Sequence, residues 1–207
     1  MHEVNLFLIT FFAALVGVIP PGLVNMAIAK TCVDFNVKAG KQKAFGAVSV
    51  VFIQALLAII IAKQILNNPN FKEKILIAGV LILMGMMIYF FIVARRQKIE
   101  SLSNKKDKHT HSFMKGVFIS SLNVFPIPYF VVISTLFTPE NQIDFSWSTK
   151  LIFALSASLG TLTTFLAYVY FFDKIIKQNK LFKKYSNYFM ALLMLCLLII
   201  TLYRIYV

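Results

Sequence analysis

The residues of this chain that could do chemistry are those that break a helix inside an apolar stretch. Pro20, Pro21 and Gly22 follow one another within the sequence VIPPGLVN, which ends at Asn25. Proline has no amide hydrogen and its ring clashes with the carbonyl one turn back, whereas glycine adopts non-helical conformations freely. The helix that starts after such a break carries a partial positive charge on its free amides, which attracts a carboxylate or another small anion. The motif therefore predicts anion binding at a broken helix.

A second break occurs in SLNVFPIPYF, which contains Asn123, Pro126 and Pro128. A shift of 106 residues places Pro20 on Pro126 and Gly22 on Pro128. A lone proline in a membrane helix usually only kinks it. Interrupted segments at matching positions of two halves are instead the best sequence pointer to a transport site. The matched breaks therefore favour a binding site shared by both halves.

Polar side chains are scarce in the other apolar segments. Gln54 stands midway along one of them, where its amide either bonds to a neighbouring helix or lines a cavity. No ionisable residue lies in the middle of an apolar segment, so no proton relay is evident, and Asp34 is interpreted as a solvated helix-end charge. One segment is rich in hydroxyl groups, and its small residues favour close helix packing: Ser156, Ser158, Thr161, Thr163, Thr164 and Tyr168.

Enzyme and metal sites are not indicated. The chain has no HExxH, GxSxG, P-loop or GxGxxG motif. Cys32 and Cys196 are far apart and form no CxxC pair, and His109 and His111 make only a weak metal motif. We therefore expect a protein that is not an enzyme and that has no resident metal or cofactor.

Membrane helices must position these residues. Of the 207 residues, 59% are hydrophobic and 14% are charged, whereas a soluble domain has about 25% charged residues. A helix needs about 20 apolar residues to cross a bilayer. The sequence therefore predicts one all-α transmembrane domain, with six spans at 5–30, 44–66, 74–94, 113–137, 150–172 and 186–207.

The distribution of charge predicts the orientation of these spans. Of the 21 Lys and Arg residues, sixteen fall in the first, third and fifth connections, which are therefore expected to be cytoplasmic, with both termini outside. The net charge of +13 thus indicates topology and attraction to anionic lipid rather than to nucleic acid. A basic cytoplasmic linker at 95–112 separates the halves 1–94 and 113–207. Three spans in each half give the halves opposite orientations, which predicts an inverted repeat.

The order of these motifs resembles that of the LysE/RhtB family of amino-acid exporters. The sequence PPGLVN is similar to the family's P-G-P motif, with Leu23 in place of the second proline. The segment FMKGVFISSLN is similar to the family's helix-four motif through Phe113, Gly116 and Asn123.

The resemblance implies a secondary transporter of the bacterial inner membrane that exports amino acids or related small zwitterions by alternating access. It also implies that the proton-motive force drives export, with sodium left open as the coupling ion. Separately, small-residue faces on the third and fifth spans allow a homodimer. The residues expected to bind substrate lie at the breaks and beside them: Pro20, Pro21, Gly22, Asn25, Gln54, Asn123, Pro126 and Pro128.

Two other classes of function stay open. A membrane-embedded redox protein or enzyme on the same architecture would need cysteines at the breaks, but Cys32 lies ten residues after Gly22 and no cysteine is near the second break. A non-transporting scaffold would pack the breaks tightly, with no cavity between them.

Overall fold

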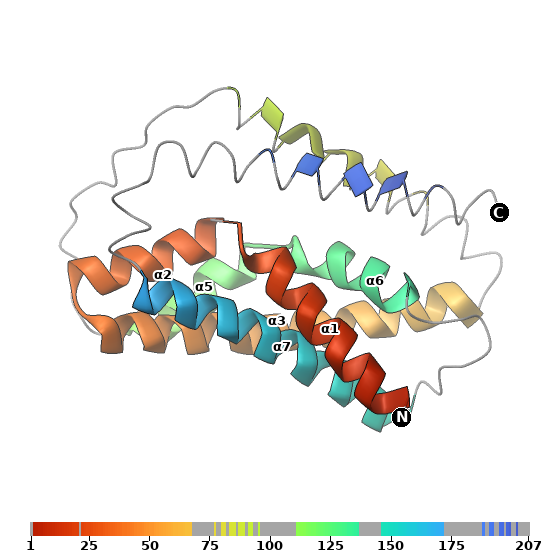
Figure 1. Ribbon diagram of the computed structural model, residues 1–207, viewed down its shortest axis with the longest axis horizontal. Coiled ribbons are helices and arrows are strands. Elements are labelled where there is room, and N and C mark those ends of the chain that lie inside the picture. Colours follow the sequence, from red (N-terminus) through yellow and green to blue (C-terminus); the bar gives the residue numbers. More distant parts are fainter. Residues whose placement is uncertain are drawn as a thin grey trace.

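The computed structural model describes residues 2–20, 22–67, 111–136 and 146–171, together with isolated positions between 77 and 95 and between 188 and 202. All regular structure in these parts is α-helical, which confirms the predicted class (Figure 1). Of the predicted third and sixth spans, only isolated residues are described, each of them helical. Residues 96–110 of the predicted linker lie outside the described residues, and so does Pro21.

Two of the predicted spans are broken. Helix α1 (His2–Val18) is followed by α2 (Leu23–Asp34), and the two axes differ by 70°. Helix α5 (Ser112–Ser121) is followed by α6 (Pro126–Leu136), with a bend of 65°. Both breaks stand where the proline-containing motifs predict them.

The two breaks match at a shift that differs from the predicted one. Val18 and Ser121 end the first helix of each pair and are 103 positions apart, and the same separation joins Leu23 to Pro126 at the starts of α2 and α6. The predicted shift of 106 is therefore wrong by three positions. Proline is tolerated as the first residue of a helix, where its missing amide has no partner to lose. Pro126 consequently starts α6, whereas Pro20 precedes α2.

Two helices are unbroken. Helix α3 (Val37–Asn67) and helix α7 (Trp147–Tyr170) are long and apolar enough to cross a membrane, and the two bent pairs raise the number of candidate spans in the described residues to four. Helix α3 begins seven residues before the predicted span, because the side-chain oxygen of Asn36 accepts a hydrogen bond from the amide of Ala39 (2.8 Å) and caps the helix. Lys38, Lys41 and Lys43 therefore belong to a helix, although they were expected in a loop.

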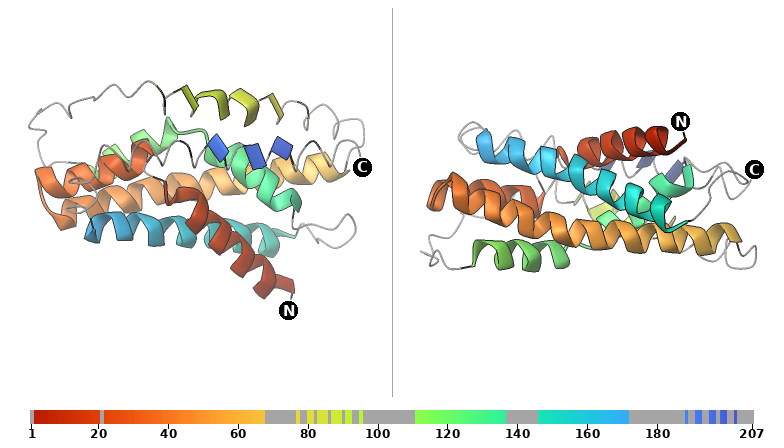
Figure 2. Two further views of the ribbon diagram at one scale, coloured as in Figure 1. Left: turned by 45° about the horizontal axis from the view of Figure 1, so that its top comes forward. Right: turned by 90° about the horizontal axis from the view of Figure 1, so that it is seen from below.

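Helix α3 is the centre of the described assembly. It packs against α2, α5, α6 and α7, while α1 packs mainly against α7 (Figures 1 and 2). Glycines allow the closest approach: a Cβ atom on Gly46 would collide with the backbone of Phe113, and one on Gly116 would collide with the backbone of Lys43. The backbones of α3 and α5 thus touch with no side chain between them.

Buried apolar side chains form two main clusters along these helices. The first cluster comprises Leu6, Ala14, Val51, Ala55, Ala58, Ile59, Phe130, Ile133, Phe153, Ala154 and Ala157. The second cluster comprises Val24, Ile28, Cys32, Ala44, Ala47, Phe165 and Val169. The first helix break lies between the clusters along the chain, since Ala14 belongs to the first cluster and Val24 to the second.

Candidate functional site

A group of buried polar residues lies where the two apolar clusters meet. Thr161 stands between Ala157 of the first cluster and Phe165 of the second, whereas Gln54 stands at the near end of the first cluster, between Val51 and Ala55. We call this group the central polar layer. It consists of Asn25, Gln54, Ser120, Asn123, Thr161 and Thr164, all of them buried except the half-buried Asn123.

The side chain of Asn25 binds the carbonyls that the first break releases. Its amide nitrogen donates to the carbonyl of Val18 (2.6 Å) and to the carbonyl of Pro20 (2.9 Å). Prolines cannot donate to the last carbonyls of α1, so the carbonyl of Val18 would otherwise be unpaired in the membrane interior. The predicted site residue Asn25 thus has a structural role at the first break.

Helix α7 supplies two further donors to the same break. The hydroxyl of Tyr168 donates to the carbonyl of Ile19 (2.7 Å), and the hydroxyl of Thr164 donates to the carbonyl of Leu15 (3.1 Å). Helix α7 lies in the second half of the chain. The first half's break is therefore held partly by the second half.

Gln54, from the first half of the chain, binds the carbonyls of the second break in the corresponding way. Its side-chain nitrogen donates to the carbonyl of Asn123 (2.8 Å) and, at longer distance, to that of Ser120 (3.4 Å). Gln54 is on α3 in the first half, while Ser120 lies in the last turn of α5 and Asn123 in the break that follows it, both in the second half. The structure thus brings Gln54 to the backbone carbonyl of Asn123 as an interhelical contact, and it pairs each break with the unbroken helix of the other half.

The two breaks differ in the free amides that they present. At the start of α6, Pro126 and Pro128 have no amide hydrogen, while the amides of Ile127 and Tyr129 donate to the carbonyls of Val124 (3.2 Å) and Phe125 (3.4 Å). The start of α6 therefore has no free amide to offer an anion.

The start of α2 is open by comparison. Gly22 occupies the N-cap position without a side chain to cap the helix, and its own amide bonds to the carbonyl of Pro20 (2.8 Å). The next three amides, at Leu23, Val24 and Asn25, have no acceptor among the described residues, as is usual for the first turn of a helix. Gly22 and Leu23 are exposed, so this end of α2 is accessible to a small anion.

Two oxygens of the central polar layer have no hydrogen-bond partner in the described part of the chain. They are Oε1 of Gln54 and Oγ1 of Thr161, whose residues are 5% and 1% exposed. Exchanging the oxygen and nitrogen of the Gln54 amide would not add a hydrogen bond, because Oε1 would then face the two carbonyls that Nε2 now binds. A buried polar group without a partner costs about 1–3 kcal/mol, which makes these two oxygens the strongest sign of an absent donor.

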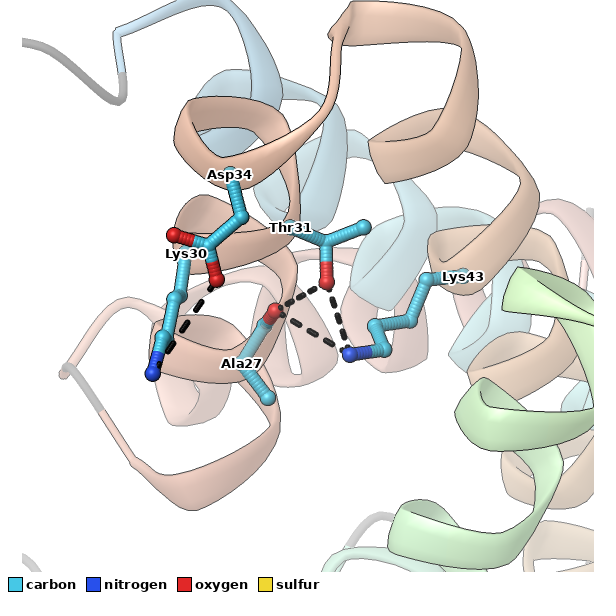
Figure 3. A network of polar contacts seen from close by, with 5 residues as sticks. All are labelled: Ala27, Lys30, Thr31, Asp34 and Lys43. Carbon is cyan, nitrogen blue, oxygen red and sulfur yellow. Dashed lines mark hydrogen bonds and ion pairs between the residues drawn. The ribbon is translucent and has the colours of Figure 1, made fainter. Parts of the chain in front are cut away.

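A lysine of α3 forms hydrogen bonds to α2 near the connection between the two helices. Lys43 Nζ donates to the hydroxyl of Thr31 (2.7 Å) and to the carbonyl of Ala27 (3.4 Å), as Figure 3 shows. On the neighbouring turn, Lys30 lies 4.0 Å from the carboxylate of Asp34. The sequence assigned Lys43 only to a basic loop, and no periodic signal marked its contact with α2.

An open apolar hollow of about 480 Å³ lies away from the central polar layer, between α1 and α6. It is lined by Leu8, Ile9, Phe12, Ala13, Val16 and Tyr129. The only polar side chain in this set is Tyr129, whose hydroxyl donates to the carbonyl of Ala13 (2.7 Å). None of the predicted site residues lines the hollow, so it does not substitute for the central polar layer.

Sequence reasoning found part of this site. Asn25, Gln54 and Asn123 lie at the breaks, while Pro20, Gly22, Pro126 and Pro128 shape them. The hydrogen bonds of Thr164 and Tyr168 and the unpartnered hydroxyl of Thr161 were missed, because hydroxyls in a segment of small residues were interpreted as packing groups. Their shared position on one face of α7, three and four residues apart, was the available signal.

Comparison with known proteins gives one match. A model of the LysE type translocator family matches residues 15–204. The matched region contains both breaks and every residue of the central polar layer. No curated protein and no solved structure matches the chain.

Proposed function

The chain belongs to the LysE type translocator family, and from that membership we propose that it is a secondary transporter exporting amino acids or related small zwitterions across the bacterial inner membrane. It is a multi-pass helical membrane protein. The observation that best supports the proposal is the reciprocal holding of the two helix breaks around the central polar layer.

The proposed site holds the carboxylate of the substrate at the open end of α2. The free amides after Gly22 carry a partial positive charge and can donate hydrogen bonds to a carboxylate. Pro20 and Pro21 keep this end separate from α1, and Asn25 occupies the carbonyls of Val18 and Pro20, which would repel an anion. In the second half, Pro126 and Pro128 shape the start of α6, and Asn123 and Gln54 would contribute polar contacts beside it.

The bonds between the halves support alternating access as the mechanism. Gln54 binds the second break and Tyr168 binds the first, so rocking one half against the other changes the surroundings of both breaks together. The site would open alternately toward the cytoplasm and toward the outside. We propose that the proton-motive force drives export, with sodium as the other candidate coupling ion.

Efflux tests this function directly. Cells loaded with radiolabelled amino acids should lose label faster when they contain the protein, for at least one member of a broad panel. A Pro21→Ala, Gly22→Leu double variant should abolish this efflux while still inserting in the membrane. A Cys32→Ser, Cys196→Ser double variant is the control and should retain efflux, because neither thiol lies at a break. Equal efflux with and without the protein across the panel would contradict the proposal.

A further inference from the structure

The two unpartnered oxygens of the central polar layer stand on helices that face each other. Helices α3 and α7 pack together and run in opposite directions (Figures 1 and 2). Along the axes of these two helices, Gln54 and Thr161 therefore lie within about one helical turn of each other. The two helices contribute to the apolar clusters in reverse order along the chain, since Ala47 and Phe165 belong to the second cluster and Ala55 and Ala157 to the first.

Both oxygens call for a hydrogen-bond donor. The Gln54 amide group already donates to two carbonyls through Nε2, so Oε1 is left as an acceptor in a buried position. The Thr161 hydroxyl is buried with it and can accept as well. Neighbouring hydroxyls are different, because Thr164 is bonded to Leu15 and Gly160, and Ser158 to Ala154.

We propose that Oε1 of Gln54 and Oγ1 of Thr161 together accept hydrogen bonds from the protonated amine of the transported substrate. This inference rests on the proposed function, in which the amides of α2 hold the carboxylate. A zwitterion needs acceptors for its other end, and these two buried oxygens are unoccupied acceptors in the described part of the layer.

The same geometry assigns a preference for substrates with no net charge. Within the described residues, the central polar layer contains amides and hydroxyls and no carboxylate. Neutral acceptors suffice for an ammonium group whose charge is balanced by the substrate's own carboxylate. The additional cation of a dibasic amino acid would have no counter-charge among these groups, and burying it unpaired is unfavourable.

The test compares matched competitors in proteoliposomes that contain the full chain. Counterflow is measured with each of twenty radiolabelled L-amino acids, and unlabelled competitors are then added in pairs that differ only in the amine: L-alanine with propanoate, L-leucine with 4-methylpentanoate, and L-threonine with 3-hydroxybutanoate. The wild type should prefer the amine-bearing member at least tenfold. Thr161→Val, which keeps the shape and removes only the unpartnered hydroxyl, should reduce this preference to within about threefold.

Thr163→Val is the matched control. Its hydroxyl bonds within α7 to the carbonyl of Leu159 (2.9 Å) on an exposed face, so the amine preference should stay as in the wild type. Gln54→Met is a second variant and should also lose the preference for the amine-bearing competitor. It is measured only in protein that remains monodisperse.

The outcomes separate this inference from the proposed function. Counterflow of amino acids with an unchanged preference in Thr161→Val would overturn the inference and leave the transporter proposal standing. The same holds if Thr161→Val changes only the dependence on sodium, because the oxygens would then serve a cation. Absence of counterflow for every amino acid in the wild type would overturn both.

Discussion

The hydroxyl of Tyr168 on α7 donates a hydrogen bond to the carbonyl of Ile19 in the first helix break, at 2.7 Å. The two residues are 149 positions apart and belong to opposite halves of the chain. Gln54 and Asn123 make the reciprocal contact, at 2.8 Å. Each break in the described structure is thus stabilised by a side chain from an unbroken helix of the other half.

Loss of the Tyr168 hydroxyl should weaken transport. Tyr168→Phe keeps the ring and leaves the Ile19 carbonyl without this donor, at a cost of about 1–3 kcal/mol. We expect initial efflux to fall by about fivefold or more. Tyr170→Phe is the matched control, since Tyr170 lies two residues away with 60% of its surface exposed. Equal efflux in both variants would show that the Tyr168 contact does not support the site.

The crossing of α3 and α5 should not tolerate a methyl group. In Gly46→Ala and Gly116→Ala the new Cβ meets the backbone of the facing helix, and such overpacking costs about 1–3 kcal/mol. Thermal unfolding in detergent should show a midpoint lower by about 2–10 °C for each variant. Gly85→Ala is the control because no atom of the described residues lies within 4 Å of its Cβ position. A midpoint lowered as much in Gly85→Ala would indicate a general effect of the substitution.

Removal of the Lys43 amine should loosen the α2–α3 contact. Lys43→Met loses the hydrogen bonds to Thr31 and Ala27, and hydrogen bonds that involve a charged group contribute about 1.5–3 kcal/mol. Cys32, which is buried in the same contact, should then react about tenfold faster with N-ethylmaleimide in a Cys196→Ser background. Lys38→Met removes an exposed lysine of α3 and should leave the rate unchanged. A wild-type rate in Lys43→Met would contradict the expected loosening.

The proposed topology can be tested with single cysteines. In a Cys32→Ser, Cys196→Ser background, Glu3→Cys should react with a membrane-impermeant maleimide in intact cells, because the N-terminus is expected outside. Lys38→Cys should react only after permeabilisation. Both positions are exposed in the structure, so burial does not limit either reaction. The opposite pattern would invert the proposed orientation.

The sequence predicted the helix breaks because proline and glycine act locally. A missing amide hydrogen disrupts a helix wherever the residue stands in its interior. The same rule could not tell an interior proline from one that starts a helix, and Pro126 is of the second kind. The expected shift between the halves was wrong for this reason.

The contacts across the halves could not be predicted in the same way. The partners of Tyr168 and Gln54 are 149 and 69 residues away in the chain. They depend on how α3 and α7 pack against the bent pairs, and no residue spacing within one helix encodes that packing. The start of α3 was also misjudged, because the lysines after Asn36 suggested a loop although Asn36 is a helix cap.

Helix α3 has 31 residues and a length of about 46 Å, whereas the hydrocarbon core of a bilayer is about 30 Å thick. The helix must therefore tilt or extend into the headgroup region, where an exposed lysine such as Lys38 can reach phosphate groups. Gln54 lies near the middle of α3 and binds the second break. A rotation of about 10° around that middle would move each end by about 4 Å. A change in the tilt of α3 would thus be transmitted to the second break through Gln54.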